Sequence, residues 1–291
     1  MLRVMIGLVV VLSVSLGRGW AEERPVAVVA AESVYGDVAR QIAGPGAVVT
    51  SILNNPDEDP HLFEASPSIA RAIAGASIVV LNGAEYDPWM RKLLGVSRRS
   101  DRRVIDVGDL LHVKPGANPH FWYDPEAMPV FARAVADAFA ASDPAHGAVY
   151  QENLERFLGS LESVAAKIAQ MRKAYAGVPV TATEPVFGLM AAAIGLSMRN
   201  QRFQLAVMNN TEPSAHDVAA FEQDLRSRAV RVLLYNSQAT DTAARRLLRI
   251  AEQSHVPVVG VTETEPPGKT YQQWMLDQLD VLDAALAKPA S

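Results

Sequence analysis

Cysteine is absent from this chain of 291 residues. Its absence excludes disulfide bonds, metal sites built from thiolates, and a lipid anchor on an N-terminal cysteine. A surplus of basic residues is also missing, because 27 lysines and arginines stand against 32 aspartates and glutamates. A formal net charge of −5 does not favour binding to a nucleic-acid backbone, so no nucleic-acid partner is expected.

Long hydrophobic runs are missing too, except near the N-terminus. Arg3 precedes the apolar run Val4 to Leu16, and Gly19 to Ala21 close it with a small-x-small pattern. This order predicts a signal peptide, residues 1–21, cleaved after Ala21. The alternative is an uncleaved anchor, but the run is shorter than the roughly 20 residues that span a bilayer.

Cleavage removes two arginines and no acid, so the basic count falls from 27 to 25 against 32 acids and the mature charge becomes −7. Export without a cysteine for lipidation predicts a soluble periplasmic protein whose mature chain does not insert into the membrane. A monomer is expected.

Short β-rich runs alternate with helical patterns over most of the mature chain, which predicts parallel sheets covered by helices. The length is sufficient for two lobes, each with its own core. The strands expected in the first half are Val26 to Ala30, Val48 to Leu53, Ser77 to Leu81 and Arg103 to Val107. Those expected in the second half are Val180 to Thr183, Arg202 to Val207, Val230 to Tyr235 and Val256 to Val261.

Between these halves, apolar residues recur at three- and four-residue spacing from Tyr150 to Tyr175. The pattern predicts one continuous amphipathic helix from Ala145 to Ala176, about 45 Å long. The expected fold class is therefore α/β, with two β/α lobes joined by one long rigid helix. The expected organisation is an N-terminal lobe over residues 22–144, a linking helix over 145–176, and a C-terminal lobe over 177–291.

Two histidines lie on loops that are stiffened by proline. His120 lies between Pro119 and Pro125, next to aromatic residues that can be buried, and His61 follows Pro60. Ligands of parallel sheets bind beyond the carboxyl ends of the strands, and His61 follows an expected strand. The two loops therefore indicate a shared site.

Carboxylates follow two strands of the second half in the same way. Glu184 follows the strand that ends at Thr183, and Glu263 and Glu265 follow the strand that ends at Val261. Taken singly, such residues are more often solvated turns or packed polar groups than ligands. Two imidazoles with two carboxylates form a four-ligand set suited to Mn(II), Fe(II) or Zn(II).

The runs Asp59 to Pro67 and Asn118 to Pro125, with the long central helix, resemble the periplasmic metal-binding proteins of zinc, manganese and iron ABC importers. The resemblance covers essentially the whole mature chain. It implies that His61, His120, Glu184 and Glu265 are the metal ligands. The family's fourth ligand is usually Asp, one methylene shorter than Glu, so Glu263 stays open as the alternative fourth ligand.

The resemblance also bears on the metal. Glu in the position of Glu184 is common in manganese and iron members, where zinc members have His. The long His- and acid-rich loop of many zinc members is absent here, and only His112 lies between the two histidine motifs. Both features favour manganese or iron over zinc, although the Irving–Williams order allows the isolated protein to bind zinc more tightly.

The predicted function is a substrate-binding protein that captures a divalent metal between its lobes and delivers it to an inner-membrane ABC permease. A rigid linking helix predicts that release needs loop rearrangement and a small tilt of the lobes. It is not expected to be an enzyme. The alternatives are an exported metal-dependent hydrolase, with Glu263 as its base, and a binder of a metal chelate or an adhesin with the same fold.

Overall fold

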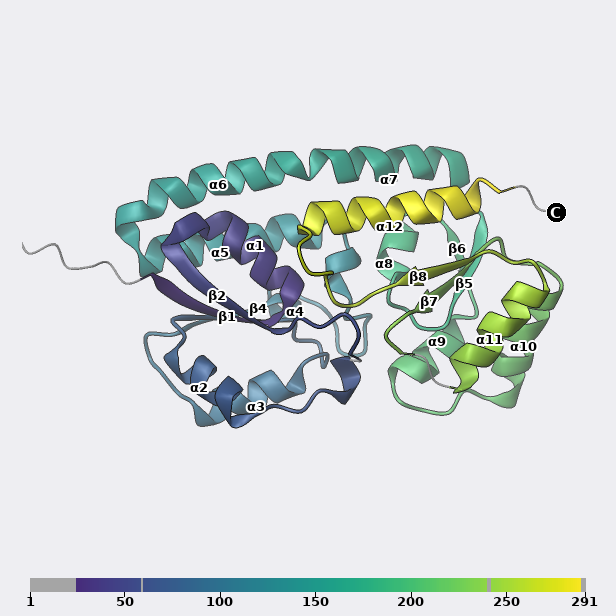
Figure 1. The fold of residues 1–291 in the computed structure, drawn as a ribbon, viewed down its shortest axis with the longest axis horizontal. Helices are drawn as coiled ribbons and strands as arrows, with labels where there is room; N and C mark the ends of the chain where they lie inside the picture. The colour runs from purple at the N-terminus through teal and green to yellow at the C-terminus, as the bar shows by residue number, and fades with distance from the viewer. Residues whose placement is uncertain (1–24, 59, 240–241, 289–291) are drawn as a thin grey trace, which may run out of the picture.

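A computed structural model describes residues 25–58, 60–239 and 242–288, without the side chain of His61. The predicted signal peptide lies outside the described residues. Two α/β lobes stand next to each other, and two helices in line run along one edge of both (Figure 1). The predicted fold class is thereby confirmed.

The sheet of the N-terminal lobe is parallel, with strand order β2-β1-β3-β4. Its strands are β1 (Val26–Glu32), β2 (Ala47–Leu53), β3 (Ile78–Leu81) and β4 (Arg103–Asp106). Its helices are α1 (Ser33–Ala43), α2 (Pro67–Gly75), α3 (Pro88–Val96), α4 (Val107–Leu110) and α5 (Ala127–Ser142). The central strands β1 and β3 are almost wholly apolar because helices cover both faces of the sheet.

The C-terminal lobe repeats this plan with strand order β6-β5-β7-β8, again parallel. Its strands are β5 (Pro179–Ala182), β6 (Ser197–Arg199), β7 (Leu233–Asn236) and β8 (Val258–Val261). Its helices are α8 (Gly188–Ile194), α9 (Gln201–Met208), α10 (Ala215–Arg226), α11 (Thr242–Gln253) and α12 (Tyr271–Leu286).

The prediction of a strand over residues 202–207 is wrong, because these residues form α9. Phe203 and Val207 lie one helical turn apart, and both pack into a small core of the C-terminal lobe. The Phe203 ring meets Phe221 of α10 edge-on, with 4.9 Å between centroids. A short alternating run was compatible with either element, and packing on α10 selects the helix.

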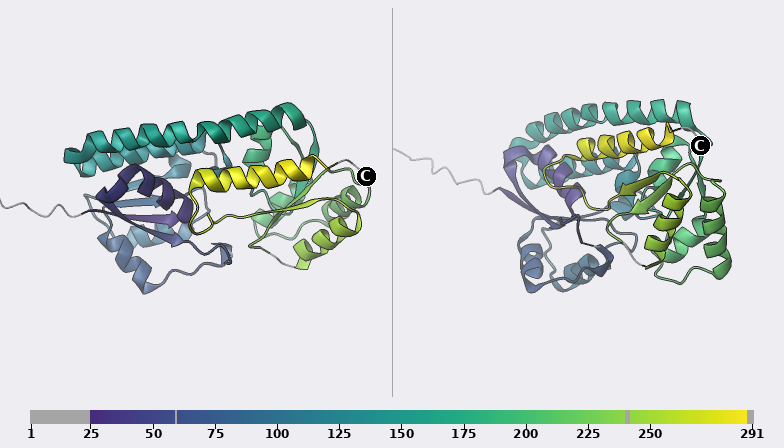
Figure 2. Two further views of the ribbon diagram at one scale, coloured as in Figure 1. Left: turned by 45° about the horizontal axis from the view of Figure 1, so that its top comes forward. Right: turned by 45° about the vertical axis from the view of Figure 1, so that its right-hand side comes forward.

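The predicted linking helix is divided into α6 (Gly147–Ser160) and α7 (Glu162–Tyr175). At the break at Leu161, the Ser160 hydroxyl donates to the Phe157 carbonyl at 2.6 Å and accepts a hydrogen bond from Gln272, and side-chain bonding of this kind competes with the backbone hydrogen bonds of a helix. The two helices still run in one direction across both lobes (Figures 1 and 2).

The lobes share one hydrophobic core that extends from β1 to α12. Helix α12 is fixed to α7, since Asp283 accepts from Lys167 and Tyr175 at 2.8 and 2.7 Å. At the junction of the lobes, Tyr123 packs on Phe187 and Trp274. This shared core limits how far the lobes can separate. None of the described helices is long and apolar enough to cross a membrane.

Candidate metal centre

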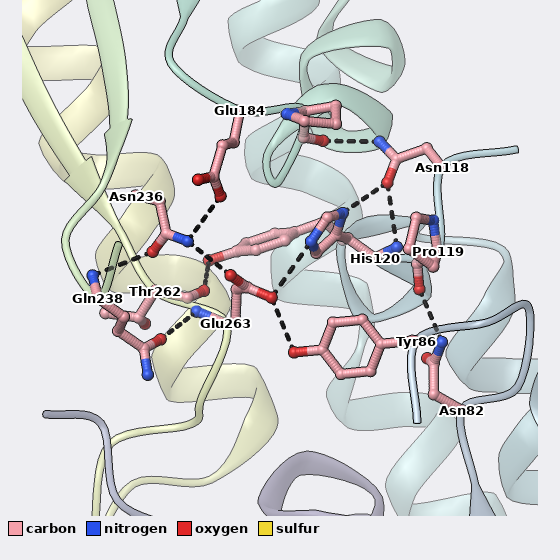
Figure 3. A network of polar contacts seen from close by, with 12 residues as sticks. Asn82, Tyr86, Asn118, Pro119, His120, Glu184, Asn236, Gln238, Thr262 and Glu263 are labelled. Atoms are coloured by element: carbon pink, nitrogen blue, oxygen red, sulfur yellow. Dashed lines mark hydrogen bonds and ion pairs between the residues drawn. The ribbon is translucent and has the colours of Figure 1, made fainter. Parts of the chain in front are cut away.

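The candidate site lies where the two lobes meet, beyond the carboxyl ends of the strands. His120 comes from the N-terminal lobe, and Glu184 and Glu263 follow β5 and β8 of the C-terminal lobe (Figure 3). The placement follows from the topology, because the carboxyl ends of parallel strands meet at one edge of each sheet.

His120 is only 1% exposed and precedes a 3₁₀ turn, Phe121–Tyr123. Its Nδ1 lies 2.6 Å from Asn118 Oδ1, which also accepts the His120 backbone N–H. The Asn118 amide donates to the Pro185 carbonyl at 2.6 Å, and this contact fixes which end of the amide is oxygen. In the neutral imidazole Nδ1 therefore carries the proton, and Nε2 presents its lone pair.

The lone pair of His120 Nε2 faces a carboxylate. Glu263 Oε2 lies 3.3 Å away, and Nε2 makes no hydrogen bond to the described residues. Two buried groups that both donate electron pairs lie face to face here, so a proton or a cation between them would stabilise the pair.

Glu263 is 1% exposed and accepts hydrogen bonds on both carboxylate oxygens. Tyr86 donates to Oε2 at 2.8 Å from the other lobe, and Asn236 donates to Oε1 at 2.5 Å. Burial and the nearby Glu263 carboxylate raise the pKa of Tyr86 well above its usual value, so the phenol stays protonated and remains a donor.

The turn that presents Tyr86 is strained. Gly83, Ala84 and Glu85 all have positive φ, and a Cβ on Gly83 would lie 2.0 Å from an Asp106 carboxylate oxygen. Asp87, after the turn, accepts the backbone N–H groups of residues 82 and 83. Such strain persists only where neighbouring contacts impose it, and here it delivers a hydrogen-bond donor to the site.

Glu184 is half-buried, and its Oε2 accepts a hydrogen bond from the Asn236 amide at 2.8 Å. The same amide nitrogen donates to Glu263. Asn236 therefore joins the two candidate carboxylates of the C-terminal lobe (Figure 3).

Gln238, two residues further on, connects the lobes. Its Oε1 accepts the backbone N–H groups of Glu263 and Thr264 at 2.6 and 3.0 Å. Its Nε2 donates at 2.8 Å to the carbonyl of Glu58, in the loop that leads to His61. Neither Asn236 nor Gln238 was among the residues predicted from the sequence. The available signal was the polar run Asn236 to Gln238 at the carboxyl end of the buried strand β7, where parallel sheets bind ligands.

Glu265 lies apart from this network. Its backbone N–H donates to the Ser33 hydroxyl at the start of α1, at 3.1 Å. Burial, and next the Asp37 carboxylate, raise the pKa of Glu265 to about 9. The structure thus brings Glu263, and not Glu265, together with His120 and Glu184.

His61 lies in a one-turn 3₁₀ helix, Pro60–Leu62, after the loop that Gln238 contacts. Over the residues that the structure describes, which omit this side chain, no three His, Asp or Glu side chains converge closely enough to hold an ion. Full coordination therefore needs His61, or a movement of Glu184 toward His120 and Glu263.

Two parallel α/β lobes along a helical edge, with histidine and carboxylates at their junction, define a two-lobed solute-binding protein. The family model described as zinc-uptake complex component A, periplasmic, matches residues 28–285. The chain belongs to this family. Its members are binding components of importers and not enzymes, and the hydrolase alternative is thereby set aside.

Relatives and solved structures agree with this membership. The manganese-binding lipoprotein MntA of Halalkalibacterium halodurans is 30% identical over 142 residues, 47% of this chain and 46% of that protein. The manganese ABC transporter substrate-binding lipoprotein PsaA of Streptococcus pneumoniae is 22% identical over 90% of this chain and 89% of its own. The periplasmic zinc binding protein TroA from Treponema pallidum has the same fold, with a TM-score of 0.78 at 18% identity over 91% of this chain and 100% of that one.

Proposed function

We propose that the protein binds one divalent transition metal ion between its lobes and delivers it to an ABC permease. The observation that carries this function is the buried pair of His120 Nε2 and Glu263 Oε2, 3.3 Å apart, with no hydrogen bond to the imidazole nitrogen from the described residues. A metal ion is a partner to which both atoms can donate a lone pair at once.

The ligand set that we propose is His61, His120, Glu184 and Glu263. Glu263 takes the fourth position because it faces His120, whereas Glu265 contacts the start of α1. Two imidazole nitrogens and two carboxylate oxygens suit Mn(II), Fe(II) and Zn(II).

Coordination requires only local movement. His120 and Glu263 already face each other, while Glu184 and the loop of His61 close the remaining positions. The core shared by the lobes favours loop rearrangement with a small tilt over wide opening. Both capture and release then depend on the loops at the lobe junction.

We infer that manganese or iron, more than zinc, is the transported ion. Two carboxylates give the site a harder character than a three-histidine set would have. MntA and PsaA are named as manganese proteins, and TroA as a zinc protein, so related chains serve both metals.

We also propose that the mature chain acts in the periplasm as a monomer, after cleavage of residues 1–21. MntA and PsaA are named as lipoproteins, whereas this sequence has no cysteine to carry a lipid. Diffusion to an inner-membrane permease would then replace anchoring. The size of the mature chain in solution and its recovery from periplasmic extracts test this.

Metal titration of the mature protein tests the binding function. Isothermal titration with Mn(II) and Zn(II) should show one site, and His120→Ala and Glu263→Gln should each weaken it by about 100-fold or more. Each has a matched control elsewhere in the chain, namely His146→Ala, on an exposed turn, and Glu265→Gln. Wild-type affinity in both site variants would refute metal binding here, and loss in Glu265→Gln alone would move the fourth ligand to residue 265.

A further inference from the structure

We propose that Asn236 is a positioning residue that sets the spacing of Glu184 and Glu263, and that this spacing determines which metal the site prefers. This inference rests on the proposed function, because it assigns the origin of selectivity within the same site. Neither motif reasoning nor the four-ligand pattern includes this residue.

The amide of Asn236 uses both of its hydrogens on the two carboxylates. Its Nδ2 lies 2.8 Å from Glu184 Oε2 and 2.5 Å from Glu263 Oε1 (Figure 3). An amide nitrogen has two N–H groups, so one is directed to each acid. Because both oxygens accept from one nitrogen, they lie within about 5 Å of each other.

Asn236 itself is held rigidly. It is 1% exposed and ends β7, the strand between β5 and β8. Its backbone N–H donates to Thr183 Oγ1 at 3.3 Å, and its side-chain oxygen accepts the Gln238 backbone N–H at 3.0 Å. The backbone and the oxygen end of the side-chain amide are thereby fixed, and the amide nitrogen remains for the carboxylates.

The topology explains why this residue can reach both acids. Glu184 lies two residues beyond the last residue of β5, and Glu263 two residues beyond the last residue of β8. Since β7 pairs with both strands, its last side chain lies between the two acids. The middle strand β7 thus sets the distance between the two ligands that follow its neighbours β5 and β8.

A fixed spacing gives the site a means of discrimination. The buried Glu263 carboxylate and the half-buried Glu184 carboxylate repel each other, and a shared donor between them offsets part of that repulsion before an ion arrives. Sites that do not impose a geometry follow the Irving–Williams order, in which zinc is held more tightly than manganese or iron. Loss of the amide should therefore weaken binding and shift preference toward zinc.

The test compares Asn236→Ala and Asn236→Ser in the mature protein with Asn209→Ala, an exposed asparagine of the same lobe. Dissociation constants for Mn(II) and Zn(II) are measured by competition with a chelating dye, and the Co(II) absorption spectrum reports the coordination geometry. In Asn236→Ala, Mn(II) affinity should fall by about tenfold more than Zn(II) affinity, and the Co(II) spectrum should change. Asn236→Ser keeps one donor and should lie between wild type and Ala, while Asn209→Ala matches wild type.

The outcomes separate this inference from the proposed function. If the wild type binds no metal, or His120→Ala binds as wild type does, the function fails and the inference fails with it. If His120→Ala abolishes binding but Asn236→Ala keeps both affinities and the Co(II) spectrum, only the role of Asn236 is overturned. An equal loss for both metals with an unchanged spectrum also overturns it, because the residue would then act through stability alone. If Asn236→Ala does not fold, Asn236→Ser decides by the same readouts.

Discussion

The two lobes have the same strand order but contribute to the site in different ways. The N-terminal lobe orients His120 with one side-chain hydrogen bond, from Nδ1 to Asn118, and with edge-on packing of its ring on Tyr86 and Trp122. The C-terminal lobe places its two acids through a network in which Asn236 contacts both carboxylates and Gln238 holds the backbone of Glu263. The same strand order therefore supports two ways of positioning a ligand side chain.

The difference follows from the chemistry of the ligands. A neutral imidazole is a ligand once a single hydrogen bond fixes its tautomer and ring orientation. A buried carboxylate carries a full charge and must receive donors to stay ionised before the metal arrives. An imidazole placed in the C-terminal lobe, or a carboxylate placed in the N-terminal lobe, should therefore change how the site binds metal.

Glu184→His introduces an imidazole into the C-terminal lobe and should have the largest effect on selectivity. It removes one negative charge and one acceptor of the Asn236 amide, and it makes the site softer. The ratio of Zn(II) to Mn(II) affinity should rise by about tenfold or more. Competition titration with both metals measures this ratio.

Glu212→His, in an exposed position of the same lobe, is the control and should leave the ratio unchanged. An unchanged ratio in Glu184→His would show that residue 184 does not set selectivity. Selectivity would then belong to the geometry of the remaining ligands.

Gln238→Ala should have a smaller effect, and it should change the rate of metal release more than the preference between metals. The variant loses the contact from the C-terminal lobe to the Glu58 carbonyl, and thus one tie on the loop that leads to His61. A freer loop should release metal faster, by a few fold, because one hydrogen bond contributes about 1 kcal/mol. Stopped-flow release into excess chelator measures the rate.

Gln223→Ala, an exposed glutamine on α10, controls for the loss of an amide side chain. Release at the wild-type rate in Gln238→Ala would assign Gln238 to the support of Glu263 alone. An equal loss of affinity for both metals, with the rate of metal release unchanged, would lead to the same assignment.

The sequence predicts the fold well because each lobe is made of local, repeating signals. Alternation of apolar runs and helical patterns places seven of the eight strands of the described residues, all in the expected chain order. The failure over residues 202–207 arises where a six-residue pattern fits strand and helix equally, so that packing on Phe221 decides. The break at Leu161 coincides with a hydrogen bond from the distant Gln272 to Ser160, which no local pattern predicts.

The site is predictable only where one loop determines one ligand. Proline-stiffened loops identify His61, His120 and Glu184, whose position as ligands remains a prediction. The choice between Glu263 and Glu265 depends on where the chain turns after β8 relative to α1, which no local pattern encodes. Asn236 is invisible to motif reasoning, because its role exists only once β5, β7 and β8 are neighbours.

The N-terminal lobe also holds buried acids, and they show what happens when donors do not offset the cost of burial. Glu32 ends β1 at 3% exposure, and neither of its carboxylate oxygens has a well-formed hydrogen bond within the described residues, although the nearby backbone N–H groups of Glu32 and Asn82 act to lower its pKa. Burial, and next the carboxylate of Asp87, raise the pKa of Glu32 well above its usual 4.5. Burial likewise raises the pKa of Asp87 to about 6, although two backbone N–H groups oppose the shift.

Glu32→Gln should therefore stabilise the protein at high pH, which is the smallest of these effects. The folded state keeps a proton on Glu32 that the unfolded state releases above about pH 4.5, so this acid costs stability as pH rises beyond that value. Glutamine cannot ionise and can still donate to Asp87. Thermal unfolding followed by circular dichroism should give a higher Tm than wild type at pH 8, by a few degrees, with a gap that narrows toward pH 4.

The exposed Glu155→Gln should show no such trend. Parallel curves for Glu32→Gln and wild type from pH 4 to pH 8 would mean that Glu32 is ionised in the folded state, and that a shortage of donors does not distinguish the acids of the two lobes.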